Sequence, residues 1–160
     1  MTSSSINNLT YTAITLDNVT ALMPIENACH THPWTEKLFR SCVGGRYFGD
    51  YAQTIDASGN SKIIGFYIGE YILGEATLMN ICVNPIEQGQ GLGNALLTQF
   101  IAQAKNLGGE QLWLDVRTSN TAAIMLYINH GFTEISRRTG YYPTATGYED
   151  SIVMGKKLVS

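Results

Sequence analysis

The sequence is poor in several features that indicate particular classes of protein. Only 14% of the 160 residues are charged and the formal net charge is −3, so a broad electrostatic surface for nucleic acid is not expected. No apolar run approaches the roughly 20 residues that a membrane-spanning helix needs. The first residues, MTSSSINN, have neither a basic flank nor an apolar stretch, so no signal peptide is predicted. We therefore expect a soluble, cytoplasmic protein that binds neither nucleic acid nor membrane.

Cysteine is also scarce. Cys29, Cys42 and Cys82 are odd in number and far apart, with no CxxC pair, so neither a disulfide framework nor a zinc site is predicted. Cys82 is expected to be a packed thiol, because no histidine lies near it in the sequence. The tripeptide HTH, with His30 and His32, is too little for a metal site. We interpret both histidines as loop residues and expect no bound metal.

The patterns that are present indicate one mixed α/β domain, which suits the chain length. Residues 1–8 are expected to be flexible and residues 9–160 to form the domain. Apolar alternation predicts strands over 9–15, 46–53, 62–69, 75–83, 111–116, 132–138 and 150–158. Helices are expected from Asp17 or Asn18 to about Cys29, after the N-cap Thr35, and over 92–107 and 121–130. A Tyr/Pro/Gly loop is expected between the last two strands.

A glycine-rich turn, QGQGLG at residues 88–93, joins a predicted strand to a predicted helix. The first N–H groups of a helix have no internal partner and stabilise an anion, and glycines let a phosphate come close. A tight turn alone would also explain the glycines. A P-loop would need Lys and Ser/Thr at 92–94, which are absent. A dinucleotide fingerprint would need a glycine where Asn94 stands, although Asp115 ends a later strand as that motif requires.

The pattern Gln88-x-x-Gly91-x-Gly93 resembles the loop with which the GCN5-related N-acetyltransferases (GNAT) cradle the pyrophosphate of acetyl-CoA. The segment SNTAAIMLYINHGF (119–132) is similar to a second block of that family, and the resemblance covers nearly the whole chain. It implies an α/β fold with a central mixed, mostly antiparallel sheet, splayed at the acetyl-CoA site and with helices on both faces. It also implies acetyl-CoA as the cosubstrate.

The segments HPWTEKLF, EATLMNICV and RRTGYYPTATGYEDSIVM resemble the branch of this family that acetylates the N-terminal alanine of a small-subunit ribosomal protein. The resemblance implies direct transfer to a protein α-amine, with the N-terminal peptide of a ribosomal protein as partner. Other interpretations stay open at this point. The chain could acetylate lysines or small-molecule amines, or could bind acyl-CoA without catalysis, and a NAD-binding domain is a more distant alternative.

Acetyl transfer from a thioester needs a neutral amine and a proton for the departing thiolate. Because an α-amine has a pKa near 7.7–8.0, roughly a tenth of it is neutral near pH 7, and a modest general base is enough. The resemblance implies that Asp115 is the proton acceptor and Tyr127 the proton donor. The branch of the family that acetylates a ribosomal protein has Glu where Asp115 stands, and the shorter side chain weakens direct transfer more than a water relay. A solvated strand-end carboxylate and a core aromatic are the ordinary alternatives.

The resemblance assigns the acetyl-CoA site to the strand before the turn, to the turn and to the residue before the last helix. These residues are Ile81, Cys82, Val83, Gln88, Gly89, Gln90, Gly91, Leu92, Gly93, Asn94 and Asn120. Gly89 and Asn94 replace arginines that are common in the motif, so phosphate contacts should depend more on backbone N–H groups. Asn120 could equally be a simple N-cap.

The substrate side is predicted from Trp34 and Glu36 in the helical pair and from Tyr141 and Tyr142, with Asp150, near the C-terminus. They could line a groove for a peptide N-terminus, and Glu36 could meet an arginine at the second position of the substrate. Each also has an ordinary role open to it, as a helix-surface acid, a hairpin aromatic or a turn carboxylate.

Overall fold

The computed structural model describes residues 9–158, so the expected flexible segment 1–8 lies outside the described residues. The elements are β1 (Thr10–Ala13), η1 (Leu16–Asn18), α2 (Val19–Cys29), α3 (Glu36–Ser41), β2 (Tyr47–Ile55), β3 (Ser61–Ile72), β4 (Glu75–Val83), η2 (Pro85–Glu87), α4 (Leu92–Asn106), β5 (Gln111–Arg117), α5 (Thr121–Asn129), β6 (Thr133–Thr144) and β7 (Gly147–Lys157). None of the helices within 9–158 combines the length and apolarity needed to cross a membrane.

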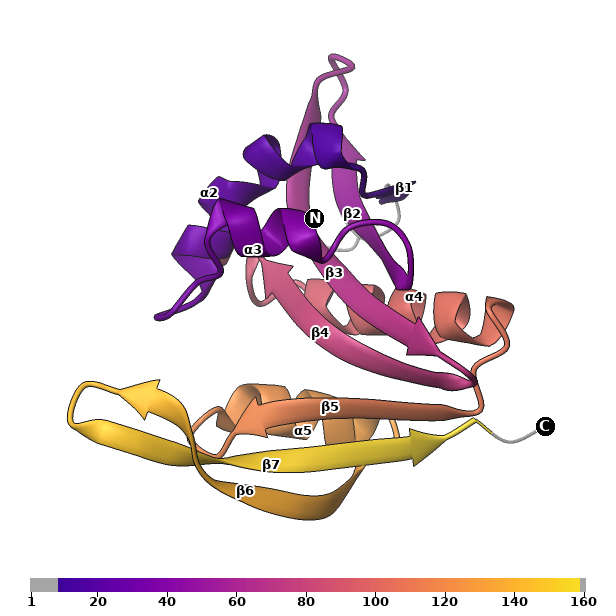
Figure 1. Ribbon diagram of the computed structural model, residues 1–160. Helices are drawn as coiled ribbons and strands as arrows, with labels where there is room; N and C mark the ends of the chain where they lie inside the picture. Colours follow the sequence, from indigo (N-terminus) through magenta and orange to yellow (C-terminus); the bar gives the residue numbers. More distant parts are fainter. Residues whose placement is uncertain (1–8, 159–160) are drawn as a thin grey trace.

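One seven-stranded sheet, in the order β1-β2-β3-β4-β5-β7-β6, organises the molecule. Neighbouring strands are antiparallel except β4 and β5, which are parallel. Helices α2 and α3 cover one face, and α4 and α5 cover the other (Figure 1). The predicted mixed, mostly antiparallel sheet with helices on both faces is confirmed. A dinucleotide-binding domain requires a mostly parallel, doubly wound sheet, so that alternative is wrong.

A β-bulge in β4 changes which face its side chains cover. Ile68 of β3 pairs with Asn80 and Gly69 pairs with Leu78, so Met79 between them has no partner on β3. Met79 is the extra residue of the bulge. Before the bulge, Leu78 packs in the core cluster under α4, whereas beyond it Cys82 packs in the cluster under α2 and α3. Bulges also increase the local twist of a strand. We infer that this twist turns the second half of β4 away from β5.

Helix α4 packs on the sheet through the apolar stripe that the sequence predicts. Its buried residues are Leu92, Leu96, Leu97, Phe100 and Ala104. The helix ends before Gly108, whose φ of 98° is in the left-handed region that favours glycine.

The predicted Tyr/Pro/Gly loop between the last two strands is wrong. Strand β6 continues to Thr144, and only residues 145–146 separate it from β7. The sequence suggested a loop because Pro143 cannot donate a backbone hydrogen bond. However, β6 is the last strand of the sheet order, and an edge strand tolerates proline.

Candidate active site

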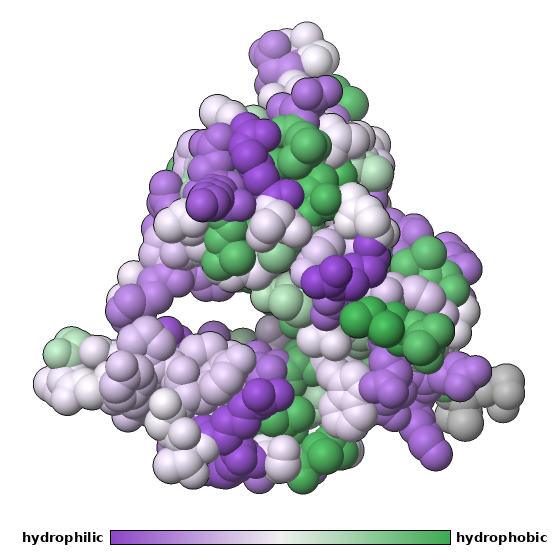
Figure 2. Space-filling view, viewed as in Figure 1, coloured by the Kyte–Doolittle hydropathy of each residue, from purple (hydrophilic) through white to green (hydrophobic). Residues whose placement is uncertain are grey.

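The candidate active site is the opening between β4 and β5. The two parallel strands pair over only four positions, ending at Leu78↔Leu114, although β4 continues to Val83 and β5 to Arg117. Beyond Leu78, the edge of β4 that faces β5 has no partner strand within the described part of the chain. Figure 2 shows a hollow between the part formed by α2 and α3 and the β6–β7 hairpin below it.

The predicted pantetheine-binding residues lie on this unpaired edge of β4. Ile81, Cys82 and Val83 are the last three residues of β4. The opposite edge of the strand pairs with β3. Unpaired strand edges present a row of backbone N–H and C=O groups. The edge can therefore hydrogen-bond an extended ligand that carries amide groups, as pantetheine does.

The glycine turn places an open helix N-terminus next to this edge. Gly89 and Gly91 have φ of 85° and 76°, and Gly91 is the N-cap of α4. No side chain caps the helix, so the N–H groups of residues 92–94 have no helical acceptor. A Cβ atom on Gly89 would meet nothing within 4 Å. Glycine is therefore favoured at this position by its positive φ, and the space beside it is open. The turn therefore leaves backbone N–H groups open to an anion, and the binding of a pyrophosphate by residues 88–93 stays a prediction.

Two polar side chains of the predicted cradle already have partners. His130 Nε2 lies 2.9 Å from Asn94 Oδ1, and Gln90 Nε2 donates to Glu87 Oε2 at 3.3 Å. Burial, and then the charge of Lys156, lower the pKa of His130, so the imidazole adds no positive charge near neutral pH. The cradle accordingly depends on its N–H groups.

Helix α5 has the N-cap residue that the sequence predicts. Asn120 is the N-cap, and its Oδ1 accepts a hydrogen bond from the backbone N–H of Ala123 at 3.2 Å. This confirms the capping role. A contact from Asn120 to acetyl-CoA stays a prediction.

Tyr127 combines a buried ring with an available hydroxyl. The residue is 5% exposed, and its ring packs edge-on against Phe132 with centroids 6.0 Å apart. No hydrogen bond joins its hydroxyl to another described residue, yet no fully buried side-chain oxygen there lacks a partner. Burial first, then the nearby Tyr142, Cys82 and Cys29, raise the pKa of Tyr127, so the phenol remains a proton donor.

Asp115 lies on the opposite face of the sheet from the α4 core, with a side chain that is 24% exposed. Its Oδ1 accepts a hydrogen bond from Ser151 Oγ at 3.1 Å and pairs with Arg138 Nε at 3.2 Å. Burial first, and then the charge of Asp115, raise the pKa of Tyr142. Tyr142 in turn raises the pKa of Tyr127, so Tyr142 lies within electrostatic range of both Asp115 and Tyr127. A shared catalytic site for Asp115 and Tyr127 stays a prediction.

The two predicted tyrosines form an aromatic wall beside Asp115. Tyr141 and Tyr142 pack edge-on with centroids 4.9 Å apart. Arg138 lies over the Tyr141 ring at 5.0 Å, and Arg117 over the Tyr142 ring at 4.6 Å. Guanidinium stacking of this kind holds both rings in fixed orientations.

The other predicted substrate residues already make contacts within the protein. Trp34 packs edge-on against Phe39, with centroids 5.7 Å apart, in the α2–α3 layer. Glu36 pairs with Arg40 at 2.8 Å on the same exposed helix, so a substrate arginine would have to compete with Arg40 for its carboxylate. Asp150 accepts a backbone hydrogen bond from β6 at 2.9 Å and has a structural role in the hairpin.

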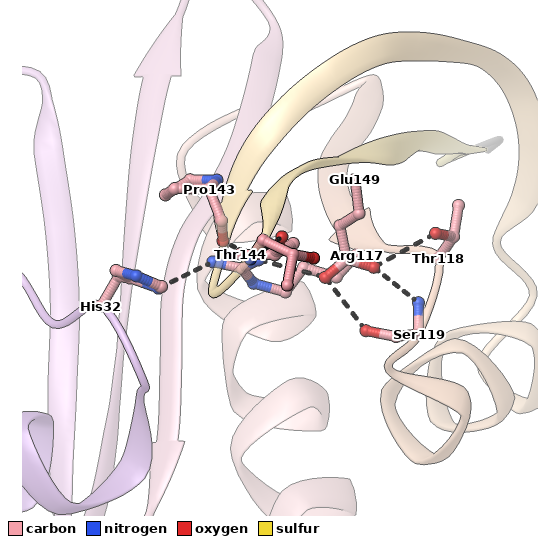
Figure 3. Close-up of polar contacts among 8 residues, drawn as sticks. His32, Arg117, Thr118, Ser119, Pro143, Thr144 and Glu149 are labelled. Carbon is pink, nitrogen blue, oxygen red and sulfur yellow. Dashed lines mark hydrogen bonds and ion pairs between the residues drawn. The ribbon is translucent and has the colours of Figure 1, made fainter.

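A polar network that the sequence analysis missed connects β5, β7 and the loop before α5 (Figure 3). Arg117 donates to Glu149 at 3.1 Å and lies 3.5 Å from His32 Nδ1 in the α2–α3 loop. Glu149 also accepts hydrogen bonds from Ser119 and Thr118. Desolvation opposes ionisation, but the hydrogen bonds from Ser119 and Arg117 prevail and lower the pKa of Glu149. No local motif marks these residues, because their contacts span 30 residues or more.

The structure places a histidine next to Cys82, although no histidine lies near it in the sequence. His30, at the C-cap of α2, places its Nε2 3.1 Å from Cys82 Sγ. Glu26 Oε1 lies 3.4 Å from the same sulfur, and Asn80 Nδ2 donates to this oxygen at 2.7 Å. The sequence distance from His30 to Cys82 concealed this cluster, which forms only when α2 packs on β4.

Cys29 belongs to the same cluster. A hydrogen bond from Cys82, and smaller effects of His30 and the backbone of Val83, outweigh desolvation and lower the pKa of Cys29 to about 6. Burial raises the pKa of Cys82. The two thiols thus differ in character, although they are neighbours.

Comparisons with known proteins agree with this architecture. The family model described as "Acetyltransferase (GNAT) family" matches residues 19–132. A [ribosomal protein bS18]-alanine N-acetyltransferase of Escherichia coli is 43% identical over 145 residues, which are 91% of this chain and 95% of the relative. That of Haemophilus influenzae is 40% identical over 134 residues, covering 83% and 88%. The crystal structure of the Escherichia coli ribosomal-protein-S18-alanine N-acetyltransferase has a TM-score of 0.86 at 39% identity, with 95% of each chain covered.

The splayed sheet, the glycine turn and these matches agree, and the chain belongs to the GNAT family of N-acetyltransferases.

Proposed function

We propose that this enzyme transfers the acetyl group of acetyl-CoA to the N-terminal α-amine of an alanine in a small-subunit ribosomal protein, in the cytoplasm. The names of relatives that are 40–43% identical over most of the chain support the substrate class. The observation that carries the proposal is the opening between β4 and β5, with Asp115 on β5 and Tyr127 on α5 both within electrostatic range of Tyr142.

Acetyl-CoA fits the groups around this opening. The pyrophosphate is assigned to the uncapped N-terminus of α4, where Gly91 is the N-cap and Gly89 leaves open space beside the backbone. The pantetheine amides are assigned to the unpaired edge of β4 at Ile81–Val83. Because Asn94 is bonded to His130, the side chains of the cradle contribute little charge, and binding relies on N–H groups.

The proposed reaction is a direct transfer. The neutral amine attacks the thioester carbonyl, so that an N–C bond forms and the C–S bond breaks. Asp115 accepts the amine proton, directly or through one water molecule, and Tyr127 donates its hydroxyl proton to the departing thiolate. The raised pKa of Tyr127 keeps that proton in place until the thiolate forms. A base of modest strength is enough for an α-amine, whereas a lysine amine holds its proton far more strongly.

The peptide is assigned to the face that carries Asp115, between the α2–α3 loop and the β6–β7 hairpin. Tyr141 and Tyr142, each stacked by an arginine, form its wall. Trp34 lies in the opposite layer. Glu36 is a weaker candidate than the sequence indicated, because a substrate arginine would have to displace Arg40 from it.

Two matched peptides test the proposal. Both begin with alanine and contain one internal lysine; one has a free N-terminus and a blocked lysine, and the other has the reverse. Mass spectrometry after incubation with acetyl-CoA should find acetylation of the free N-terminus only. Acetylation of the lysine alone would reject the N-terminal assignment. Bound acetyl-CoA without any product would favour a different amine substrate or a non-catalytic acyl-CoA-binding role.

A further inference from the structure

Four metal-binding side chains converge where the end of α2 packs on β4. Cys29 Sγ, His30 Nε2 and Cys82 Sγ lie within 4.8 Å of one another. The Oε1 atom of Glu26, one turn earlier on α2, lies 3.4 Å from Cys82 Sγ and 3.7 Å from His30 Nε2. Two thiols, an imidazole and a carboxylate are the donor types of tetrahedral zinc sites.

The separations among His30, Cys82 and Glu26 are close to those of a tetrahedron around zinc. Bond lengths of about 2.3 Å to sulfur and about 2.0–2.1 Å to nitrogen or oxygen place neighbouring ligand atoms roughly 3.3–3.8 Å apart at the tetrahedral angle. The observed separations are 3.1 Å from His30 to Cys82, 3.4 Å from Cys82 to Glu26 and 3.7 Å from His30 to Glu26. Shifts of a few tenths of an ångström would therefore bring these three donors to coordination distance, and Cys29 Sγ, within 4.8 Å of His30 Nε2 and Cys82 Sγ, would move in to complete the set.

The surrounding residues hold the donors in place and limit access of water. Glu26 and Cys82 are each 1% exposed. The second oxygen of Glu26 accepts the backbone N–H of Trp34 at 2.8 Å, and Asn80 Nδ2 donates to Oε1 at 2.7 Å. Outer hydrogen bonds of this kind orient ligating carboxylates. Packing alone does not require two thiols and a histidine to meet at a buried carboxylate.

We propose that Cys29, His30 and Cys82, with Glu26 as the fourth ligand, form a zinc-binding site that links α2 to β4. Thiolate and imidazole ligands favour Zn²⁺ over Mg²⁺ or Ca²⁺. Four protein donors leave no open position, so the ion has a structural role. It fixes the α2–α3 layer against the strand whose free edge borders the opening. The inference does not depend on which amine the enzyme acetylates.

The test uses Co²⁺ as a spectroscopic probe on the full-length, fully reduced, metal-free protein. The wild type should show the visible bands of tetrahedral Co²⁺ together with thiolate-to-metal charge-transfer absorption, and added Zn²⁺ should displace them. Zn²⁺ should also raise the melting temperature. In Cys29→Ser the charge-transfer absorption per bound Co²⁺ should fall, because only the Cys82 thiolate remains, and Co²⁺ affinity should fall by more than the roughly 10- to 100-fold that removal of an outer-shell partner costs.

Matched substitutions within the chain provide the controls. Cys42→Ser removes a cysteine outside the cluster and should retain the wild-type spectrum. His30→Ala should weaken Co²⁺ binding while thiolate absorption persists, whereas His32→Ala, two residues away, should leave binding unchanged. Circular dichroism confirms that each variant is folded. The proposal is overturned if the reduced wild type shows no thiolate absorption, if Cys29→Ser binds Co²⁺ as the wild type does, or if His32→Ala weakens binding as much as His30→Ala.

Discussion

Arg138 Nε lies 3.2 Å from the Oδ1 atom of Asp115, so the carboxylate proposed as the base is held in an ion pair on the substrate face. Ser151 donates to the same oxygen at 3.1 Å. The arginine side chain is 53% exposed, and ion pairs this exposed contribute about 0–1 kcal/mol to stability. A substrate ammonium can therefore compete with Arg138 for the carboxylate without a large energetic cost.

Asp115→Asn should lower kcat by at least about 100-fold near pH 7, the lower end of what general-base catalysis contributes. The amide oxygen still accepts from Ser151, so the fold is retained. The defect should shrink as the pH rises above about 8, because the substrate α-amine then loses its proton to solvent. The measurement is a pH profile of kcat for the alanine peptide.

Arg138→Gln is the control for this change, since it keeps the carboxylate, and its kcat should stay within a few-fold of wild type. A defect of constant size across pH in Asp115→Asn would show that Asp115 orients the peptide and does not remove its proton.

Tyr127→Phe should lower kcat by roughly 10²- to 10⁴-fold, because it removes the proton for the thiolate. The KM for acetyl-CoA and the melting temperature should change little, since the ring still packs on Phe132 and the hydroxyl has no partner among the described residues. Tyr148→Phe is a matched control, because Tyr148 is 72% exposed in the hairpin. Equal activity of Tyr127→Phe and wild type would exclude Tyr127 as the acid.

Gly89→Ala and Gly59→Ala separate backbone strain from ligand binding. The two glycines have nearly the same φ, 85° and 84°, and a Cβ atom on either would meet nothing within 4 Å. Each substitution should cost about 1–2 kcal/mol of stability from left-handed strain. Only Gly89→Ala should also raise the KM for acetyl-CoA, because Gly59 lies in the β2–β3 hairpin. Parallel changes of KM in both variants would remove residues 88–93 from the cofactor site.

Local patterns predicted most of the fold. Strand β4 has the predicted bounds, 75–83, because alternation and the following Asn-Pro give clear limits. The same alternation concealed the bulge at Met79, since EATLMNICV looks like one regular strand, although its two halves face different cores. Only pairing with β3 determines that feature, and it accompanies the opening of the site.

The site was predicted where a motif is continuous in sequence and missed where packing creates it. The glycine turn and the Asn120 cap follow from local backbone requirements. By contrast, the Arg117–Glu149 ion pair and the approach of His30 to Cys82 join elements that are 32 and 52 residues apart. Single-sequence patterns contain no information about such contacts.

The buried Tyr67 should make the protein lose stability at alkaline pH. Its hydroxyl donates to Asp50, and burial, followed by this bond and the charge of Asp50, raises the pKa of Tyr67 above its ordinary 10.0. The stabilisation is fully present below about pH 10 and falls as the pH rises further, because the unfolded chain releases a proton that the folded chain keeps. Urea unfolding between pH 8 and about 11 should show this fall, and it should be shallower in Tyr67→Phe. Tyr148→Phe should follow the wild-type curve, and parallel curves for Tyr67→Phe and wild type would contradict the assignment.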